Sequence, residues 1–126
     1  MACFIVPAAE AAAVTVTAHV LKRREEAACA KSPAGEEALP WSRKLSWLSN
    51  LLWGGVLLLA FEHLWHGEIV PFFPFLTAMG DPGETGQMLH EMSTVGVTMA
   101  VIVTVVWLAI VAAARTILNR REGALQ

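Results

Sequence analysis

The stretch TVGVTMAVIVTVVWLAIVAAA, residues Thr94 to Ala114, decides the fold class. It holds twenty-one residues without a single charged side chain, and roughly 20 helical residues cross the hydrocarbon core of a bilayer. Arg115 follows immediately. The stretch is therefore predicted to be a transmembrane helix whose basic end lies at the bilayer surface.

Two further stretches are long and apolar enough to cross a bilayer. One covers residues 45–66 and begins LSWLSNLLWGGVLLLAFEHLW; the other covers residues 2–21 and reads ACFIVPAAEAAAVTVTAHVL. The span at 94–114 belongs to a longer predicted helix over residues 85–119. The chain is 56% hydrophobic and only 16% charged, which is too apolar for an ordinary soluble domain. We therefore predict an all-α membrane protein, a single membrane domain of residues 1–126 with three transmembrane helices.

The basic residues are segregated along the chain. All nine Lys and Arg lie within residues 22–44 or 115–121. Because cytoplasmic loops carry an excess of Lys and Arg, this predicts an outer N-terminus, a cytoplasmic link over 22–44, an outer loop over 67–84 and a cytoplasmic C-terminus. A secretory signal is the alternative for the first stretch, but its basic residues follow the apolar run instead of preceding it. No basic patch with interleaved aromatic residues indicates nucleic-acid binding.

The outer loop is expected to be aromatic and non-helical. In its segment VPFFPFL, Pro71 and Pro74 argue against a regular helix, and the phenylalanines suit the outer interface of a membrane. Asp81 as N-cap and Pro82 as the first helical residue indicate a helix start. Two glycines in the following turn favour a later start at Thr85.

The outer boundary collects ionisable side chains. Counting about 1.5 Å per helical residue places Glu62, His63 and His66 at the outer end of the second span, level with His90 and Glu91 before the third. No Lys or Arg falls on this side. A buried carboxylate here therefore needs a proton, a hydrogen bond, a bound cation or a cation from another subunit.

Glu10 is the deepest of these groups. It lies roughly 12 Å inside the first span, counted from its outer end. We expect Glu10 to be neutral or hydrogen-bonded, because hydrocarbon does not solvate a lone carboxylate. His19 lies near the other membrane face and is not expected to join the outer groups.

Four interpretations of the outer groups stay open. The first is a water-facing acidic rim without further function. The second is a divalent-metal site for zinc, iron or manganese, since imidazole and carboxylate without thiolate suit these ions; its ligands would be His63, His66 and His90 with Glu62 or Glu91. The third is a proton or cation path through Glu10, Glu62 and Glu91. Haem is the fourth and weakest, because an axial histidine pair would lie close to the water.

The remaining features favour association over catalysis. Gly54 and Gly55 in the second span, and Gly96 in the third, offer small surfaces where helices approach closely. Three spans enclose little volume, so we expect a homo-oligomer or a larger membrane complex. Cys3 and Cys29 are interpreted as ordinary small apolar residues. No nucleophile elbow accompanies the serines and threonines, so we do not expect an enzyme.

Three segments carry a resemblance: MACFIVPAAEA, WGGVLLLAFEHLWHGEIVPFFPFL and MLHEMSTVGVTMA. Together they resemble a group of short bacterial membrane proteins of unassigned function, over most of the chain apart from the cytoplasmic link. The resemblance implies that the first stretch belongs to the mature protein, and it brings no catalytic or binding residues. We therefore expect a small multi-pass protein of the bacterial inner membrane, acting as an accessory, non-catalytic subunit, with metal binding or proton or cation handling as the alternative.

Overall fold

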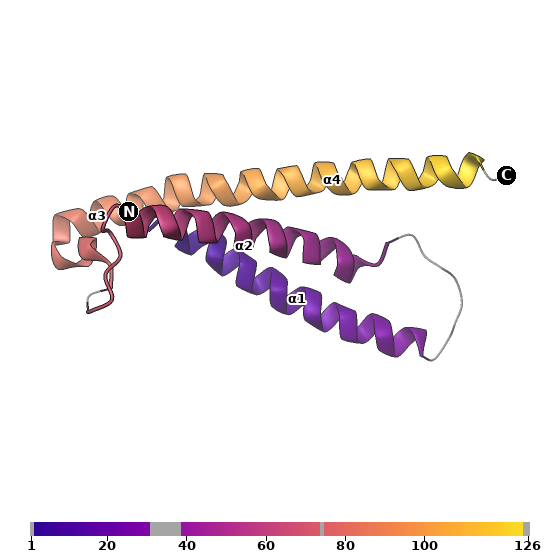
Figure 1. Cartoon of the computed structure of the whole chain (residues 1–126), viewed down its shortest axis with the longest axis horizontal. Helices are drawn as coiled ribbons and strands as arrows, with labels where there is room; N and C mark the ends of the chain where they lie inside the picture. Colours follow the sequence, from indigo (N-terminus) through magenta and orange to yellow (C-terminus); the bar gives the residue numbers. More distant parts are fainter. Residues whose placement is uncertain (1, 31–38, 74, 125–126) are drawn as a thin grey trace.

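The computed structural model describes residues 2–30, 39–73 and 75–124, and every long element in it is helical. Helix α1 covers Ile5–Cys29 and helix α2 covers Trp41–Trp65. A short 3-10 helix, η1 (Thr77–Gly80), precedes α3 (Pro82–Glu91), the π-helical turn η2 (Met92–Gly96) and α4 (Val97–Ala124). Figure 1 shows α3, η2 and α4 following one another along one side of the molecule, with α1 and α2 beside them.

Three helical segments are long and apolar enough to cross a membrane: Ile5–Cys29, Trp41–Trp65 and Pro82–Arg120. The all-α class and the three candidate spans predicted from the sequence are therefore confirmed. Helices α1 and α2 also extend into the stretch predicted as the cytoplasmic link, because α1 continues to Cys29 and α2 begins at Trp41. The direction of the chain across the membrane stays a prediction.

The third long segment begins where the capping pattern indicates. The Asp81 side chain accepts hydrogen bonds from the backbone N–H groups of Gly83 (3.0 Å) and Glu84 (3.2 Å). Pro82 stands at the first helical position, where its missing N–H is not needed. The helix therefore starts at Pro82, and the later start at Thr85 is not adopted.

The loop between α2 and α3 is non-helical over most of its length. Ile69 and Leu76 pair in an isolated antiparallel bridge, and Gly67 takes a positive φ of 72° as the chain leaves α2. The side chains of Phe72, Phe73 and Phe75 are exposed. This part agrees with the aromatic, irregular loop predicted from its prolines.

The helices pack along two small apolar clusters. One joins α1, α2 and α4 through Ala11, Leu48, Leu52, Trp107 and Val111. The other, at the end where the N-terminus lies (Figure 1), joins Ala2, Ala78 and Met88. The Trp107 indole N–H also donates to the backbone oxygen of Lys44 at 2.7 Å, which fixes α4 against α2.

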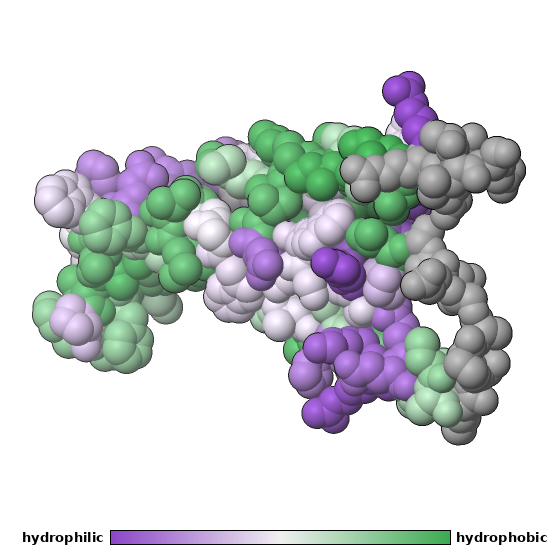
Figure 2. All heavy atoms as spheres, turned by 45° about the vertical axis from the view of Figure 1, so that its right-hand side comes forward, coloured by the Kyte–Doolittle hydropathy of each residue, from purple (hydrophilic) through white to green (hydrophobic). Residues whose placement is uncertain are grey.

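Most of the apolar surface of the helices remains uncovered. In the apolar 18-residue part of each candidate span, only 17% of the first and 22% of each of the other two is buried inside the chain. Figure 2 shows broad hydrophobic areas on the face that it presents. A chain that exposes so much apolar area on its helices is expected to contact the lipid bilayer.

Candidate functional site

His63 has the most contacts of the predicted site residues, at the end of the molecule that is predicted to face outward and is called the outer end below. Its side chain is buried, with 7% of its surface exposed. Nδ1 lies 2.6 Å from the backbone oxygen of Leu59, and a carbonyl oxygen only accepts, so Nδ1 carries the proton and donates. In the neutral ring Nε2 is then the acceptor, and it lies 3.4 Å from Sγ of Cys3. The thiol therefore donates to Nε2.

Two other groups complete the surroundings of His63. The Phe4 ring meets it edge-on, with ring centroids 5.4 Å apart. A carboxylate oxygen of Glu68 lies 3.7 Å from Nε2, and it forms an ion pair when the imidazole is protonated. The contacts made by His63 thus tie α2 to the segment before α1 and to the loop after α2.

Cys3 is the residue that the sequence analysis missed. It was interpreted as a small apolar residue, yet its thiol is the polar partner of His63. Cys3 lies just before the candidate span that starts at Ile5, and burial is the main cause that raises the pKa of its thiol. The group therefore stays protonated, as its role as donor requires. No sequence spacing links residues 3 and 63, so only the helix packing shows the pair.

The five predicted metal ligands are not gathered. Glu62, His66 and His90 are exposed, Glu91 is partly buried and His63 is buried. Among the described residues, no group of three or more His, Cys, Asp and Glu side chains is placed to hold a metal ion. The metal site stays a prediction that this arrangement does not support.

Helical phase explains the separation. Successive residues are 100° apart around an α-helix, so Glu62 and His66 share one face and His63 lies on another. The face with His63 packs inward against Cys3, and the face with Glu62 and His66 points away from the bundle. Equal depth in the membrane therefore does not bring these side chains together.

Glu10 is partly buried and contacts another span. The hydroxyl of Thr104 in α4 donates to Oε1 of Glu10 in α1 at 2.8 Å. Glu10 is thus hydrogen-bonded, as expected for a carboxylate at its depth. Thr104 is the eleventh of the twenty-one residues in the charge-free stretch Thr94–Ala114. The contact therefore lies at the middle of the third predicted span.

The hydroxyl of Thr104 has two acceptors within reach. Besides Glu10, its oxygen lies 3.0 Å from the backbone oxygen of Ala100. A hydroxyl has a single proton, and the Ala100 carbonyl can only accept. When Glu10 is ionised, Thr104 donates to the carboxylate; when Glu10 is protonated, Glu10 donates to Thr104 and Thr104 donates to Ala100. The second arrangement satisfies all three groups.

A separate group of polar contacts lies further along α1, on the side that faces α2. Thr15 lies 2.7 Å from the Ser49 hydroxyl and accepts a hydrogen bond from the Trp53 indole at 3.1 Å. Next to this pair, a groove of about 280 Å³ opens between α1 and α2, lined among others by His19, Lys22 and Asn50. Polar groups therefore follow the α1–α2 contact from Thr15 towards the end that carries Lys22.

No protein-family model, curated protein or solved structure matches the chain. The functional argument therefore depends on the geometry described above.

Proposed function

We propose that this membrane protein binds and releases protons at Glu10 inside the bilayer. The observation that carries the proposal is the hydrogen bond between Glu10 and Thr104 at the middle of the charge-free stretch. An ionisable residue at this depth is costly to keep, about 2.5–3.5 kcal/mol or more for the charged form, and marks proton or ion pathways in membrane proteins. The two hydrogen-bond arrangements at Thr104 provide for both protonation states.

The charge distribution supports a proton over a permanent ion pair. No Lys or Arg occurs between residues 45 and 114, and the first Lys or Arg of the chain is Lys22, twelve positions after Glu10. At 1.5 Å per residue that is roughly 18 Å along the helix, too far for a salt bridge. Neutralisation by a proton is the simplest means available to Glu10.

The other two carboxylates of the predicted path lie at the outer end. Glu62 is exposed near the end of α2, and Glu91 is partly buried at the end of α3. In this proposal they collect protons from the outer solution. On the other side of Glu10, Thr15, Ser49 and the groove beside them offer hydrogen-bonding groups towards Lys22.

Proton flux into liposomes tests the proposal. The purified chain is reconstituted with a pH-sensitive dye inside, and a pH gradient is applied to wild type and to Glu10→Gln. We expect the flux of Glu10→Gln to fall by roughly tenfold, because glutamine keeps the hydrogen bond but cannot take up a proton. Glu84→Gln, at an exposed helix start, is the matched control and keeps the wild-type flux. A wild-type flux equal to that of empty liposomes, or an unchanged flux in Glu10→Gln, overturns the proposal.

We further propose the orientation that the basic residues favour, in the bacterial inner membrane. The N-terminus and the loop at 67–84 then lie outside, with Cys29 and Arg115 at the cytoplasmic side. Cys29 is exposed in the structure and so reports on its side of the membrane. In intact cells, a membrane-impermeant thiol reagent should modify a Gly83→Cys variant and leave Cys29 unmodified. Labelling of Cys29 alone would indicate the opposite orientation in the membrane.

An accessory role is the second candidate, and the uncovered apolar surface favours it. The exposed large side chains include Leu57, Leu58 and Phe61 on α2 and Ile102 and Val105 on α4. Lipid covers such residues, but so does another membrane protein. Cross-linking in native membranes, followed by purification, shows whether lipid alone or another membrane protein covers these side chains. A single defined partner, or a second copy of the chain, supports the accessory role, and recovery of the uncross-linked chain alone contradicts it.

A further inference from the structure

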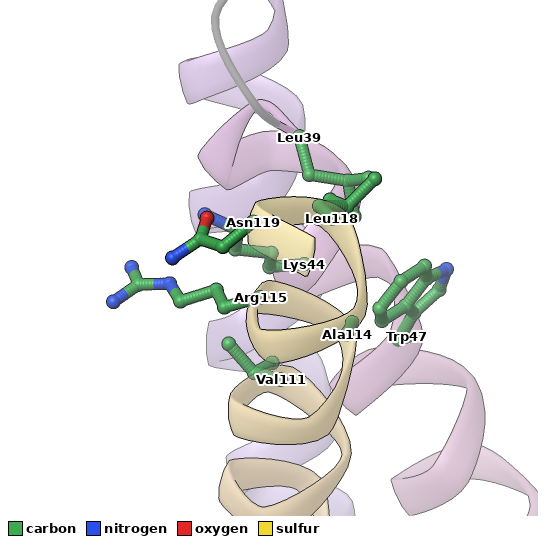
Figure 3. A pocket seen from close by; sticks show the side chains of 8 residues that line it. All are labelled: Leu39, Lys44, Trp47, Val111, Ala114, Arg115, Leu118 and Asn119. Carbon is green, nitrogen blue, oxygen red and sulfur yellow. The ribbon is translucent and has the colours of Figure 1, made fainter. Parts of the chain in front are cut away.

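A mixed polar and apolar groove lies at the end of the bundle opposite to His63. It has a volume of about 250 Å³ and is formed by α2 and α4 near the start of α2. Figure 3 shows the polar ends of Lys44, Arg115 and Asn119 together on one side of the groove. Its apolar lining comes from Leu39, Trp47, Val111, Ala114 and Leu118.

The two cations in this groove are held close to one aromatic ring. The Lys44 ammonium lies 4.8 Å and the Arg115 guanidinium 5.7 Å from the centre of the Trp41 ring. Lys44 is also 94% buried, since only 6% of its surface is exposed. Two like charges gathered at one indole repel each other, and a buried ammonium loses hydration. Both effects favour an anion between them.

The described part of the chain supplies no such anion. Within it, the recorded ion pairs are Lys22 with Glu26 and His63 with Glu68. Neither involves Lys44 or Arg115. The positive charge of the groove is therefore not compensated by the carboxylates that the structure places.

The level of the groove identifies the source of the anion. Arg115 is the first charged residue after the charge-free stretch that ends at Ala114, so the groove lies where hydrocarbon meets the headgroup layer. Val111, one helical turn further into the stretch, is buried at the floor of the groove, and the partly exposed Trp47 offers an apolar surface beside it. A ligand with a phosphate at the cations and an acyl chain along α4 fits both parts. Basic pockets between transmembrane helices bind anionic lipid headgroups in this way.

We propose that the groove of Lys44, Arg115 and Asn119 binds the phosphate group of an anionic phospholipid in the membrane leaflet at this end of the bundle. The guanidinium of Arg115 and the ammonium of Lys44 carry the charge-assisted hydrogen bonds to the phosphate oxygens, and the Asn119 amide donates beside them. The site is independent of Glu10, and it stands whether or not the chain moves protons.

Native mass spectrometry of the full chain in detergent tests the site. Phosphatidylglycerol and phosphatidylcholine of equal chain length compete for wild type, Arg115→Gln and Arg120→Gln. Arg120 is exposed, lies on the same helix and does not line the groove. Arg120→Gln is therefore the control, because it removes the same charge as Arg115→Gln without changing the groove. We expect wild type and Arg120→Gln to prefer phosphatidylglycerol. In Arg115→Gln the ratio of bound phosphatidylglycerol to bound phosphatidylcholine should fall about fivefold, since one basic residue near the headgroups contributes about that factor.

Two results would overturn the proposal. One is a wild-type chain without preference for phosphatidylglycerol. The other is an equal loss in Arg115→Gln and Arg120→Gln, which would indicate general attraction by positive charge. Inorganic phosphate is added in a separate arm: if it displaces the lipid at millimolar concentration and binds alone, the source is a soluble phosphate and the lipid assignment is wrong. An Asn119→Ala variant that keeps its helical content serves as a second probe of the same groove.

Discussion

The ionisable side chains at the outer end of the molecule differ in their surroundings from Glu10. At the outer end, Glu62, His66 and His90 are exposed, and His63 is used in packing against Cys3 and Phe4. At the middle of the third predicted span, a single carboxylate meets a single hydroxyl from another helix. A group in water needs no partner, whereas a group in hydrocarbon requires one.

The comparison shows that the predicted depth of an ionisable side chain in the membrane says more about its contacts than the number of such side chains nearby. The outer end holds more imidazoles and carboxylates than any other part of the chain, but exposure leaves most of them without a fixed geometry. Glu10 is alone at its depth, and its protonation changes the hydrogen bonds of Thr104 and Ala100. The outer end is therefore a packed junction with a solvated rim, and the hydrogen bond between Thr104 and Glu10 is the contact on which the proposal of proton binding rests.

The largest effect is expected at the junction itself. A Cβ atom on Gly96 would lie 2.8 Å from the backbone oxygen of Cys3 and 3.1 Å from Cγ2 of Val6. Backbone cannot move aside cheaply, so Gly96→Ala should lower the free energy of unfolding by about 2–3 kcal/mol. Denaturation in mixed detergent micelles, followed by circular dichroism, measures the change.

Gly55→Ala is the matched control, because nothing lies within 4 Å of a Cβ at that position. Alanine is a better helix former than glycine, so this variant should keep or gain up to about 1 kcal/mol. If both variants unfold alike, Gly96 does not join α1 to the third span and the junction described here is wrong.

A second, smaller effect separates two histidines that are three residues apart. His63→Ala removes hydrogen bonds to Leu59 and Cys3 and leaves the buried thiol without its acceptor. We expect a loss of about 1–2 kcal/mol in unfolding free energy. His66→Ala changes an exposed side chain and should stay within about 0.5 kcal/mol of wild type. Equal losses would show that the outer end is not divided into a packed and a solvated face.

The smallest effect is expected at the hydroxyl beside Glu10. Thr104→Val keeps the shape of the side chain and removes the contact with Glu10, so it should cost about 0.6–1 kcal/mol, as hydrogen bonds between membrane helices do. Thr98→Val, whose hydroxyl donates to the backbone oxygen of Thr94 four residues earlier in the same helical segment, is the control and should be close to neutral. A neutral Thr104→Val would mean that the contact between α1 and α4 contributes nothing to stability.

The sequence predicts the spans well because their signal is local. Charge-free length identifies the stretch Thr94–Ala114, and the capping pattern at Asp81 and Pro82 indicates the observed start of the third long segment, although the two glycines that follow favoured a start at Thr85. The sequence also indicates Glu10 as a candidate site residue, since the energetic cost of a carboxylate in the bilayer depends on its depth. These features need no knowledge of how the helices pack.

The contacts of the candidate sites could not be predicted, because they depend on the rotation of each helix. The pair Cys3 and His63 is separated by 60 positions, and Glu10 and Thr104 by 94. The metal hypothesis grouped residues of similar depth, and the helical phase of α2 separates them. Lys44 was interpreted only as a charge that sets the topology, although packing buries it beside Arg115 in the groove between α2 and α4.

Infrared spectroscopy of the chain in lipid bilayers tests the protonation of Glu10 most directly. A protonated carboxylic acid has a carbonyl band that a carboxylate lacks, and the position of the band depends on its hydrogen bonds. We predict a band that shifts in Thr104→Val, persists in Glu84→Gln and is missing in Glu10→Gln. A spectrum of Glu10→Gln that matches wild type at every pH would contradict the assignment of proton binding to Glu10.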